Sequence, residues 1–370
     1  MLVTDAFMAA LEADEDWPLI WQGETVRTVK ARALWQRIME RTYAGAEPGV
    51  LFIDRMNALN PMAYAETISA TNSCAEQPLP PNGNCPLGAV NLARLVRNPF
   101  EADAMMDLDR LRRVATVAVR MTDNVIDVSA YPVAAQREEA LAKRRIGIGV
   151  TGVADALAML GLVYGSDEAV AALETWLHAL RVACIEASVA LAKEKGSFPA
   201  FEAGPYLASE AMAWLDDRLR AEIAEHGLRN AALTTIAPTG TTSMLAGNVS
   251  SGIEPIFATS YHRKVTQPDG TRTSEEVVDY AVGLYRQRFG TDTPLSPAFA
   301  TAMDLTPEAH VRMQAAAQRH IDSAISKTVN CPADIEFDAF EGVYQLAYRS
   351  GCKGCTTYRP NDVTGSVLET

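Results

Sequence analysis

A short segment around residue 74 carries side chains suited to chemistry. It has an amide at Asn72, a thiol at Cys74 and a carboxylate at Glu76, and a second thiol follows at Cys85. In an extended or loop backbone, alternate side chains project to the same side. The prolines at positions 78, 80 and 81 cannot continue a helix. We therefore predict a loop that presents Asn72, Cys74 and Glu76 together to one substrate.

Residue types alone leave the role of Cys74 open between nucleophile, metal ligand and buried spectator. A cysteine nucleophile usually works with a histidine base, and all five histidines lie far away in the sequence. A metal site would have closer ligand spacing, so no metal site is predicted here. The nearby carboxylate would raise the thiol pKa, because like charges disfavour the thiolate. This environment suits a thiol that reacts as neutral S–H or as a sulfur radical.

A hydroxyl-rich turn is the second candidate site. It consists of Pro238, Thr239, Gly240, Thr241, Thr242 and Ser243. Its hydroxyls and backbone N–H groups could bind a phosphate, and a helix beginning here would add its positive end. An ordinary hydroxyl-capped turn is the alternative interpretation. The polar, glycine-rich continuation to residue 255 is typical of ligand loops.

Two further motifs are weaker. Residues 147–152 match the dinucleotide pattern GxGxxG, but no second strand ending in an acid follows about 20 residues later. A nicotinamide-dependent dehydrogenase would rest on this match alone, so we expect a close-packed strand–helix turn. Cys352 and Cys355 have redox or zinc spacing without a second pair. Cys184 and Cys331 are interpreted as core or loop residues.

Composition limits the class of protein. The 370 residues are 48% hydrophobic and 21% charged, which is typical of a globular protein with a sizeable core. A net charge of −13 argues against a nucleic-acid surface, and any phosphate must be held by local donors. No apolar run approaches the roughly 18 residues of a membrane span, and the N-terminus lacks signal-peptide features. We expect a cytoplasmic protein with reduced cysteines.

Helical and strand patterns alternate along the chain. Apolar spacing predicts helices at 30–43, 106–128, 152–162, 168–195, 306–325 and 338–350, and strands at 49–53, 146–150, 233–236 and 354–358. The apolar residues of the second helix are Leu108, Leu111, Val114, Ala118, Met121 and Val125. This alternation predicts an α/β fold with a mainly parallel sheet, open or closed into a barrel. We predict one domain, with longer loops at 78–99 and 265–294.

Residues 72–92 strongly resemble the active-site finger loop of ribonucleotide reductases, and most closely that of the adenosylcobalamin-dependent class (class II). The likeness extends to residues 47–54, 144–157, 237–255, 323–328 and 351–360. The resemblance implies a ten-stranded α/β barrel of two parallel halves with the finger loop at its centre. Residues 1–370 would form a single partial catalytic domain, mainly the second half-barrel, with the finger loop at about 70–92 and the phosphate turn at about 237–255.

The resemblance also implies roles for the candidate residues in reducing ribonucleotides to 2′-deoxyribonucleotides. Cys74 would carry the thiyl radical that abstracts the 3′ hydrogen, and Glu76 would act as base on the 3′ hydroxyl. Asn72 would hold the ribose hydroxyls in register. Cys85 would be one of two thiols that supply electrons and end as a disulfide. Residues 238–243 would hold the phosphates, and adenosylcobalamin would supply the radical.

The chain departs from the family pattern in the finger loop. Ser73 and Ala75 stand where the usual loop has proline and glycine, and alanine does not easily adopt positive φ. Pro86 after Cys85 removes a backbone donor. Near the C-terminus, Tyr358 lies between Thr357 and Arg359 rather than in a tyrosine pair, which favours the cobalamin class over an iron-dependent one.

The family normally has a long segment before the point that matches residue 1, and that segment carries the partner cysteine of Cys85. We therefore expect an N-terminally incomplete chain that needs a complementary N-terminal polypeptide, and a thioredoxin-like or other dithiol as reductant. Direct nucleic-acid and membrane partners are not expected. The alternative hypothesis is a truncated, inactive relative that keeps the fold, with or without nucleotide binding.

Overall fold

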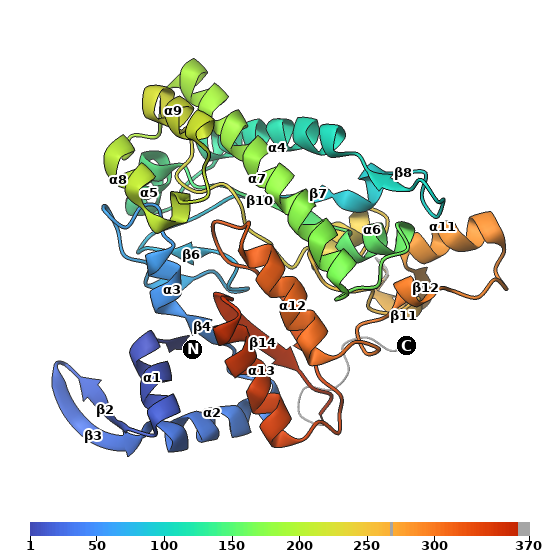
Figure 1. The fold of residues 1–370 in the computed structure, drawn as a ribbon, viewed down its shortest axis with the longest axis horizontal. Helices are drawn as coiled ribbons and strands as arrows, with labels where there is room; N and C mark the ends of the chain where they lie inside the picture. The colour runs from blue at the N-terminus through green and yellow to red at the C-terminus, as the bar shows by residue number, and fades with distance from the viewer. Residues whose placement is uncertain (267–268, 362–370) are drawn as a thin grey trace.

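The computed structural model of the chain describes residues 1–266 and 269–361 (Figure 1). Its α-helices are α1 (Asp5–Ala13), α2 (Ala31–Gly45), α3 (Ile53–Ala58), α4 (Leu108–Val128), α5 (Ala134–Lys143), α6 (Val153–Met159), α7 (Asp167–Lys195), α8 (Ala203–Ala208), α9 (Asp217–His226), α10 (Gly240–Leu245), α11 (Tyr280–Phe289), α12 (Pro307–Gln318) and α13 (Phe337–Arg349). Its strands are β1 (Leu2–Val3), β2 (Asp16–Trp21), β3 (Glu24–Lys30), β4 (Val50–Phe52), β5 (Ala70–Thr71), β6 (Pro78–Leu79), β7 (Leu87–Asn91), β8 (Val96–Arg97), β9 (Met105–Met106), β10 (Gly147–Thr151), β11 (Ser260–Thr266), β12 (Arg272–Val278), β13 (Thr328–Asn330) and β14 (Gly354–Tyr358). Short 3-10 turns lie at η1 (Leu92–Leu95), η2 (Glu210–Met212) and η3 (Pro297–Phe299).

A wall of paired backbone segments runs through the molecule. Strand β7 pairs in parallel with β10, and parallel bridges then join Ile148 to Thr234 and Ile236 to Ile325. The chain continues into β13, which pairs in parallel with β14. Strand β14 is antiparallel to β4, and β4 is parallel to β1. This largely parallel wall with surrounding helices confirms the predicted α/β fold class.

Two hydrophobic cores pack against this wall. The larger one gathers buried residues of α4, α6, α7 and β10, with the long α7 crossing in front of the wall (Figure 1). The smaller core joins the two ends of the chain. In it, Trp35 of α2 lies 6.2 Å from the Phe7 ring of α1 and 6.3 Å from the Tyr344 ring of α13. The N-terminal and C-terminal elements therefore share one packed interior.

Local signals explain why many predicted elements are confirmed. The hydroxyl of Ser166 caps the start of α7 by accepting from Ala169 N, and Gly196 ends the helix at φ 83°. Thr306 caps α12, with proline at its first position, as expected. Strand β14 has the bounds that the sequence predicted. These ends are set by residues within one turn of the boundary, so the sequence alone specifies them.

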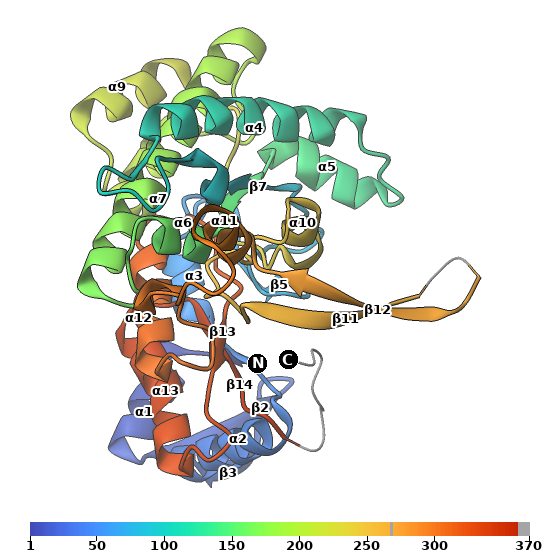
Figure 2. The ribbon, with the colours of Figure 1, turned by 90° about the vertical axis from the view of Figure 1, so that its right-hand side faces the viewer.

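Other predictions were wrong where distant pairing decides the backbone. Helix α12 was expected to reach residue 325 but ends at Gln318. Beyond it, Ser323 N donates to Thr234 O and Ser326 N to Ile236 O, so this segment belongs to the wall. The expected loop at 265–294 contains the end of the β11–β12 hairpin and helix α11, with 267–268 outside the described residues. That hairpin projects far from the body of the molecule (Figure 2). The expected loop at 78–99 contains β6, β7, η1 and β8.

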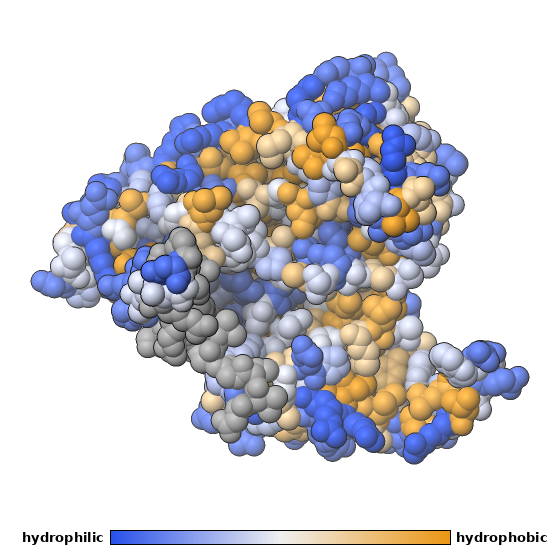
Figure 3. All heavy atoms as spheres, turned by 180° about the vertical axis from the view of Figure 1, so that it is seen from behind, coloured by the Kyte–Doolittle hydropathy of each residue, from blue (hydrophilic) through white to orange (hydrophobic). Residues whose placement is uncertain are grey.

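Only part of the apolar spacing that predicted α4 faces the core: Leu111 is buried, and Leu108 and Ala118 pack against the core. Val114, Met121 and Val125 are 37%, 59% and 39% exposed. The residues of α4 that the core buries are Leu111, Ala115, Val119, Thr122, Asp123 and Ile126. The apolar spacing indicated the helix correctly, but packing decides which of its apolar residues the core covers. Other hydrophobic residues also lie on the surface seen from behind (Figure 3).

The glycines of β10 permit close packing of the wall. A Cβ on Gly149 would lie 2.1 Å from Thr235 O, and one on Gly147 would lie 2.6 Å from Gln77 Nε2. Gly152 has φ 72°, which favours glycine. The GxGxxG match is therefore explained by backbone packing, as the close-packed turn interpretation predicted.

Helix α7 is the one described helix with the length and composition of a membrane span. Most of its apolar window, 72%, is buried inside the protein, which is typical of a core helix.

Candidate active site: a cysteine turn and a hydroxyl-rich turn

The finger loop is a short hairpin closed by a turn. Strands β5 and β6 pair antiparallel, with Thr71 opposite Pro78, and residues 72–77 connect them. Asn72 O accepts from Ala75 N, and Asn72 Oδ1 accepts from Gln77 N, both at 3.1 Å. Ala75 adopts φ 68°. The loop thus takes the positive φ that alanine was expected to resist, and the hydrogen bonds around it hold that conformation.

Backbone contacts fix this hairpin to the wall. The carbonyl oxygen of Glu76 accepts from Thr235 Oγ1 at 2.7 Å and from Ala324 N at 2.9 Å. The Gln77 carboxamide oxygen lies 3.4 Å from Ser323 Oγ. These donors belong to the two segments bridged by Ile236 and Ile325. These hydrogen bonds therefore fix the position of the thiol-bearing turn on the central strands.

The turn separates its side chains by environment. Ser73 and Cys74 are exposed, with Ser73 Oγ 3.8 Å from Cys74 Sγ, whereas Glu76 and Gln77 are both buried. Alternate positions therefore do not share one environment, contrary to the simple alternation expected. Glu76 Oε2 and Gln77 Nε2 are buried and have no hydrogen-bond partner among the described residues. Such atoms are rare in folded proteins and call for a ligand or water.

Cys85 is half-buried, with its Sγ 3.6 Å from Pro86 O. Burial raises the pKa of this thiol well above its usual range, and the Glu76 carboxylate raises it further. The Arg145 guanidinium opposes the shift, but Arg145 is itself paired with the buried Glu66. Cys85 is therefore a neutral thiol near Glu76, which places two of the predicted site residues in one electrostatic environment.

The hydroxyl-rich turn follows the wall directly. Thr239 has φ 55° and precedes the six-residue helix α10. The Thr239 hydroxyl accepts from Gly252 N at 2.8 Å and lies 3.0 Å from Thr151 Oγ1. Ser243 is buried, and its Oγ donates to Gly240 O. Gly240, Thr241 and Thr242 are exposed. The exposed part of the turn is thus free to meet a ligand, while its inner hydroxyls hold its shape.

The two candidate turns are linked through Thr235. This residue bonds the finger loop and lies only four positions before Thr239. At roughly 3.3 Å per residue, the connection spans on the order of 10 Å. A nucleotide with its sugar at one turn and its phosphates at the other has that scale. The roles of Asn72, Cys74, Glu76, Cys85 and residues 238–243 stay predictions.

The CxxC pair lies elsewhere and is buried. Cys352 and Cys355 are both in the smaller core, and burial raises the pKa of each thiol. The described residues contain no group of three or more His, Cys, Asp or Glu side chains able to hold a metal ion. Cys184 and Cys331 are also buried, as expected for core residues.

Sequence reasoning missed several residues that shape the site. The finger loop is supported by Gln77 and Thr235, and Arg145 acts on Cys85. Lys327 connects Glu254, near the end of the loop 245–255, to the wall. Lys327 Nζ donates to Glu254 Oε2 at 2.6 Å, and Thr328 N donates to Glu254 Oε1. Burial lowers the pKa of Lys327. The signal that could have found Gln77, Arg145 and Lys327 is the family resemblance, since they lie in its segments 72–92, 144–157 and 323–328, whereas Thr235 lies outside them.

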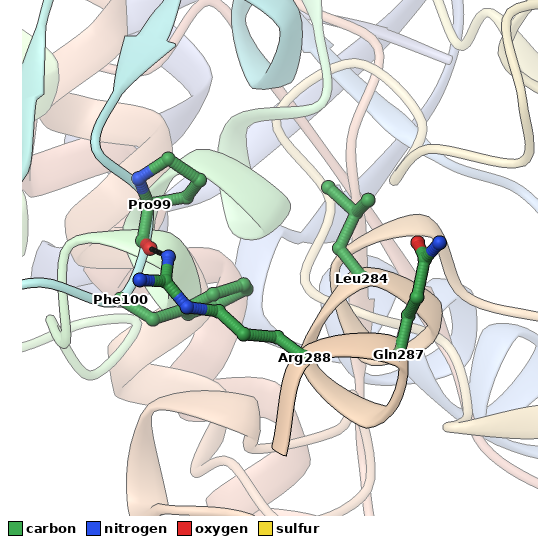
Figure 4. A pocket seen from close by; sticks show the side chains of 5 residues that line it. All are labelled: Pro99, Phe100, Leu284, Gln287 and Arg288. Carbon is green, nitrogen blue, oxygen red and sulfur yellow. Dashed lines mark hydrogen bonds between the residues drawn. The ribbon is translucent and has the colours of Figure 1, made fainter. Parts of the chain in front are cut away.

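A separate hollow of about 310 Å³ lies between the turn before α4 and helix α11. Its lining residues are Pro99, Phe100, Leu284, Gln287 and Arg288 (Figure 4). The Arg288 guanidinium closes one side by donating to Pro99 O at 2.9 Å. None of these residues belongs to the finger loop or the hydroxyl-rich turn.

Comparison with known proteins gives one consistent result. Residues 1–358 match the family model described as "Ribonucleotide reductase, barrel domain". Over 99% of its length, the chain is 38% identical to a vitamin B12-dependent ribonucleoside-diphosphate reductase of Mycobacterium tuberculosis, of which the match covers 52%. It is 35% identical to the protein of that name from Thermoplasma acidophilum, covering 99% of the chain and 47% of the relative. The chain spans about half the length of these relatives.

Proposed function

The chain belongs to the ribonucleotide reductase family through its barrel domain, and on this premise we propose that it reduces ribonucleotides to 2′-deoxyribonucleotides by a thiyl-radical mechanism. The observation that carries the proposal is the buried, unpaired carboxylate oxygen of Glu76 beside an exposed Cys74. A ribose seated on this turn would give that oxygen a hydroxyl partner. The names of the relatives support the same reaction class.

The residues of the finger loop would share the chemistry at the sugar. Cys74 Sγ, as a radical, would take the 3′ hydrogen atom, and its exposure at the tip of the turn makes it accessible. Glu76 would accept the proton of the 3′ hydroxyl and so help the 2′ hydroxyl leave as water. Asn72 Oδ1 is engaged with Gln77 N, so Asn72 would use its amide N–H groups to orient the ribose.

Cys85 would supply reducing electrons together with a second thiol. Product formation consumes two thiols and yields one disulfide and one water. A neutral thiol can give up a hydrogen atom, and burial keeps Cys85 in that form. All six cysteines of the chain are unpaired in the structure. The second thiol would come from a complementary N-terminal polypeptide, and a thioredoxin-like or other dithiol would reduce the disulfide afterwards.

Residues 238–243 would hold the substrate phosphates. The local donors would be the backbone N–H groups of the exposed Gly240, Thr241 and Thr242 and the Thr241 hydroxyl, since the Thr242 hydroxyl already donates to Thr239 O. Such donors are needed because the chain carries a net charge of −13, which disfavours anions at long range. Helix α10 is only six residues long, so individual hydrogen bonds rather than a helix dipole would carry the affinity.

Adenosylcobalamin would be the cofactor, as the names of the relatives suggest. The residues present fit this group at the finger loop, because Cys74 Sγ is exposed and a bulky cofactor could approach it. When bound, the cofactor supplies the radical. Cys74 would be the group that receives it, and the turn would hold that sulfur in place.

The remaining partners follow from this assignment. We propose a cytoplasmic enzyme whose substrate is a ribonucleoside diphosphate or triphosphate, without direct nucleic-acid or membrane contacts. The position of Tyr358 between Thr357 and Arg359 agrees with the cobalamin class, since Thr357 occupies the adjacent place and bonds Tyr344 at 2.8 Å.

A cysteine-labelling experiment tests the proposal without requiring turnover. We expect iodoacetamide to alkylate Cys74 first, because it is the exposed thiol. A saturating ribonucleoside diphosphate should slow this reaction at least tenfold, whereas the free base should not. Mass spectrometry of the peptide containing residue 74 gives the rates. Unchanged labelling in the presence of nucleotide would remove the substrate from this turn.

Turnover then tests the chemistry. With adenosylcobalamin, dithiothreitol and a complementary N-terminal polypeptide, Cys74→Ala should form no deoxynucleotide, because the radical position is lost. Cys184→Ala is the matched control, since Cys184 lies buried in α7. Chromatography of the products measures both. Near-normal activity of Cys74→Ala would overturn the mechanism, and a chain that binds nucleotide but never turns over with any complement would support the inactive-relative alternative.

A further inference from the structure

Asp155 is a fully buried carboxylate that joins three distant parts of the chain. It lies in the first turn of α6 with no exposed surface. Its Oδ2 accepts from Ser250 N at 2.6 Å, and its Oδ1 accepts from Ala281 N at 2.9 Å. Both oxygens thus accept hydrogen bonds from backbone N–H groups, one in the loop 248–252 and one at the start of α11. A charged side chain in such a place is costly unless it is fully bonded.

Ser250 in turn caps the start of α6, although it lies far from that helix in the sequence. Its Oγ accepts from Ala154 N at 3.1 Å, and its carbonyl accepts from Gly152 N at 2.7 Å and from Thr151 Oγ1 at 2.9 Å. In a capping box the serine and the acid lie three residues apart. Here they are 95 residues apart, so the reciprocal contact fixes a loop to a helix rather than a helix to itself.

The same residues reach the hydroxyl-rich turn. Thr151, which bonds Ser250 O, lies 3.0 Å from Thr239 Oγ1. The Thr239 hydroxyl also accepts from Gly252 N, two residues after Ser250. Thr239 has a left-handed backbone, φ 55°, which is unfavourable for threonine without support. The conformation that opens the turn is therefore held by Thr151 and by the loop that Asp155 anchors.

We propose that Asp155 is the positioning residue of the phosphate-binding turn, acting through Ser250 and Thr239; this inference rests on the proposed function of residues 238–243. Asp155 does not face the ligand. It sets where the loop 248–252 lies, and this loop sets the conformation of Thr239. Nucleotide affinity should depend on Asp155 only through the phosphates.

A second carboxyl group lies beside Asp155 and defines the charge state. Asp279 caps α11 by accepting from Val282 N. Burial and the Asp155 charge raise the pKa of Asp279 well above its usual range. Burial also raises the pKa of Asp155, but the hydrogen bonds from Ser250 N and Ala281 N oppose that shift, so of the two carboxyl groups Asp155 is the one whose bonding favours the charged form.

The test compares Asp155→Asn with a matched variant in the full chain. Asparagine keeps the size but leaves a single acceptor oxygen, so either Ser250 N or Ala281 N loses its partner. Asp123→Asn is the control, because Asp123 is equally buried but bonds Arg144 and Asn230. We would measure dissociation constants for a ribonucleoside diphosphate and for the corresponding nucleoside by calorimetry and competition.

In Asp155→Asn, the gain in affinity from the diphosphate should fall at least tenfold, while nucleoside binding stays within twofold of the wild type. Asp123→Asn should keep the full gain. An unchanged gain, or an equal loss for both ligands, would overturn the inference and leave the proposed function intact. A wild-type chain without any gain would instead refute phosphate binding by the turn, and both proposals with it. If Asp155→Asn does not fold, Ser250→Ala decides by the same criteria.

Discussion

At the scale of single residues, Glu76 has the features of a group prepared for a ligand. Its backbone carbonyl oxygen accepts two hydrogen bonds from the wall, whereas its buried Oε2 has no hydrogen-bond partner in the described ranges. Leaving a buried polar atom unsatisfied costs about 1–3 kcal/mol. Glu76 itself is anchored through its main-chain carbonyl oxygen, not through its carboxylate. The side chain can therefore change partners without loosening the turn.

Cys85 shows a different use of burial. A thiolate would be a better nucleophile, but the environment of Cys85 disfavours it, since burial and Glu76 both raise the thiol pKa. Hydrogen-atom and disulfide chemistry at this residue would begin from S–H. The protonation state thus fits the proposed reduction better than it fits an acyl-transfer nucleophile.

His310 predicts a dependence of stability on pH. Its Nδ1 accepts from Lys327 Nζ at 3.0 Å, and its Nε2 then donates to Ala302 O at 3.2 Å. Burial and the Lys327 charge lower its pKa to about 3. Between that value and about 6.5, the unfolded chain binds a proton that the folded chain excludes, so stability should fall as pH falls, by up to about 1.4 kcal/mol per pH unit.

Urea unfolding of the wild type and of His310→Gln at pH 7, 6, 5 and 4 measures this dependence. In the variant, the free energy of unfolding should change less steeply with pH, by the contribution of about one proton, because glutamine does not titrate. A remaining slope is expected from His320, whose pKa burial lowers to about 4. Parallel stability profiles for the two proteins would contradict the assignment.

At the scale of elements, the glycines of β10 predict a contrast between two substitutions. Gly149→Ala would place a Cβ 2.1 Å from Thr235 O, and backbone cannot move aside cheaply, so we expect a loss of several kcal/mol, about 3 or more. Gly342 lies inside α13 with nothing within 4 Å of its added Cβ. Gly342→Ala should therefore stabilise by about 0.5–1 kcal/mol.

Thermal and urea unfolding give both values. The wall between β10 and the segment 234–236 also holds the finger loop, so Gly149→Ala should additionally weaken nucleotide protection of Cys74. Equal stability of the two alanine variants would show that β10 and Thr235 are not packed as described.

The same contrast shows what the sequence could predict. Elements with local signals were found, such as α7 with its Ser166 cap and β14 with its neighbouring glycine. Residues 323–325 were predicted as the end of a helix, because their pairing with residues 234–236, about 90 positions away, has no local signal. The candidate residues of the finger loop were identified, but their seat on Thr235 and Ala324 was not. Contacts over such separations have no local pattern.

At the scale of the whole molecule, the two ends of the chain close one structure. Strand β14 lies between β4 and β13, and Phe52 N donates to Lys353 O at 3.0 Å. The Arg359 guanidinium donates to Tyr43 O and lies over the Tyr43 ring. Residues separated by some 300 positions thus share strand pairing and core. The N-terminal helices and the C-terminal helix should therefore gain and lose structure together.

Trp35 gives the test of this coupling. It is fully buried between α1 and α13, so Trp35→Ala should cost about 3–5 kcal/mol. Trp35→Phe is the matched control: it keeps an aromatic ring and removes an indole N–H that has no partner within the described structure. Hydrogen exchange followed by mass spectrometry should show that Trp35→Ala deprotects α1, α2, α13 and β14 together, while α7 in the larger core stays protected. Deprotection confined to α2 would mean that the two chain ends are separately stable. If they share one core, loss of Trp35 must loosen the elements on both sides of it.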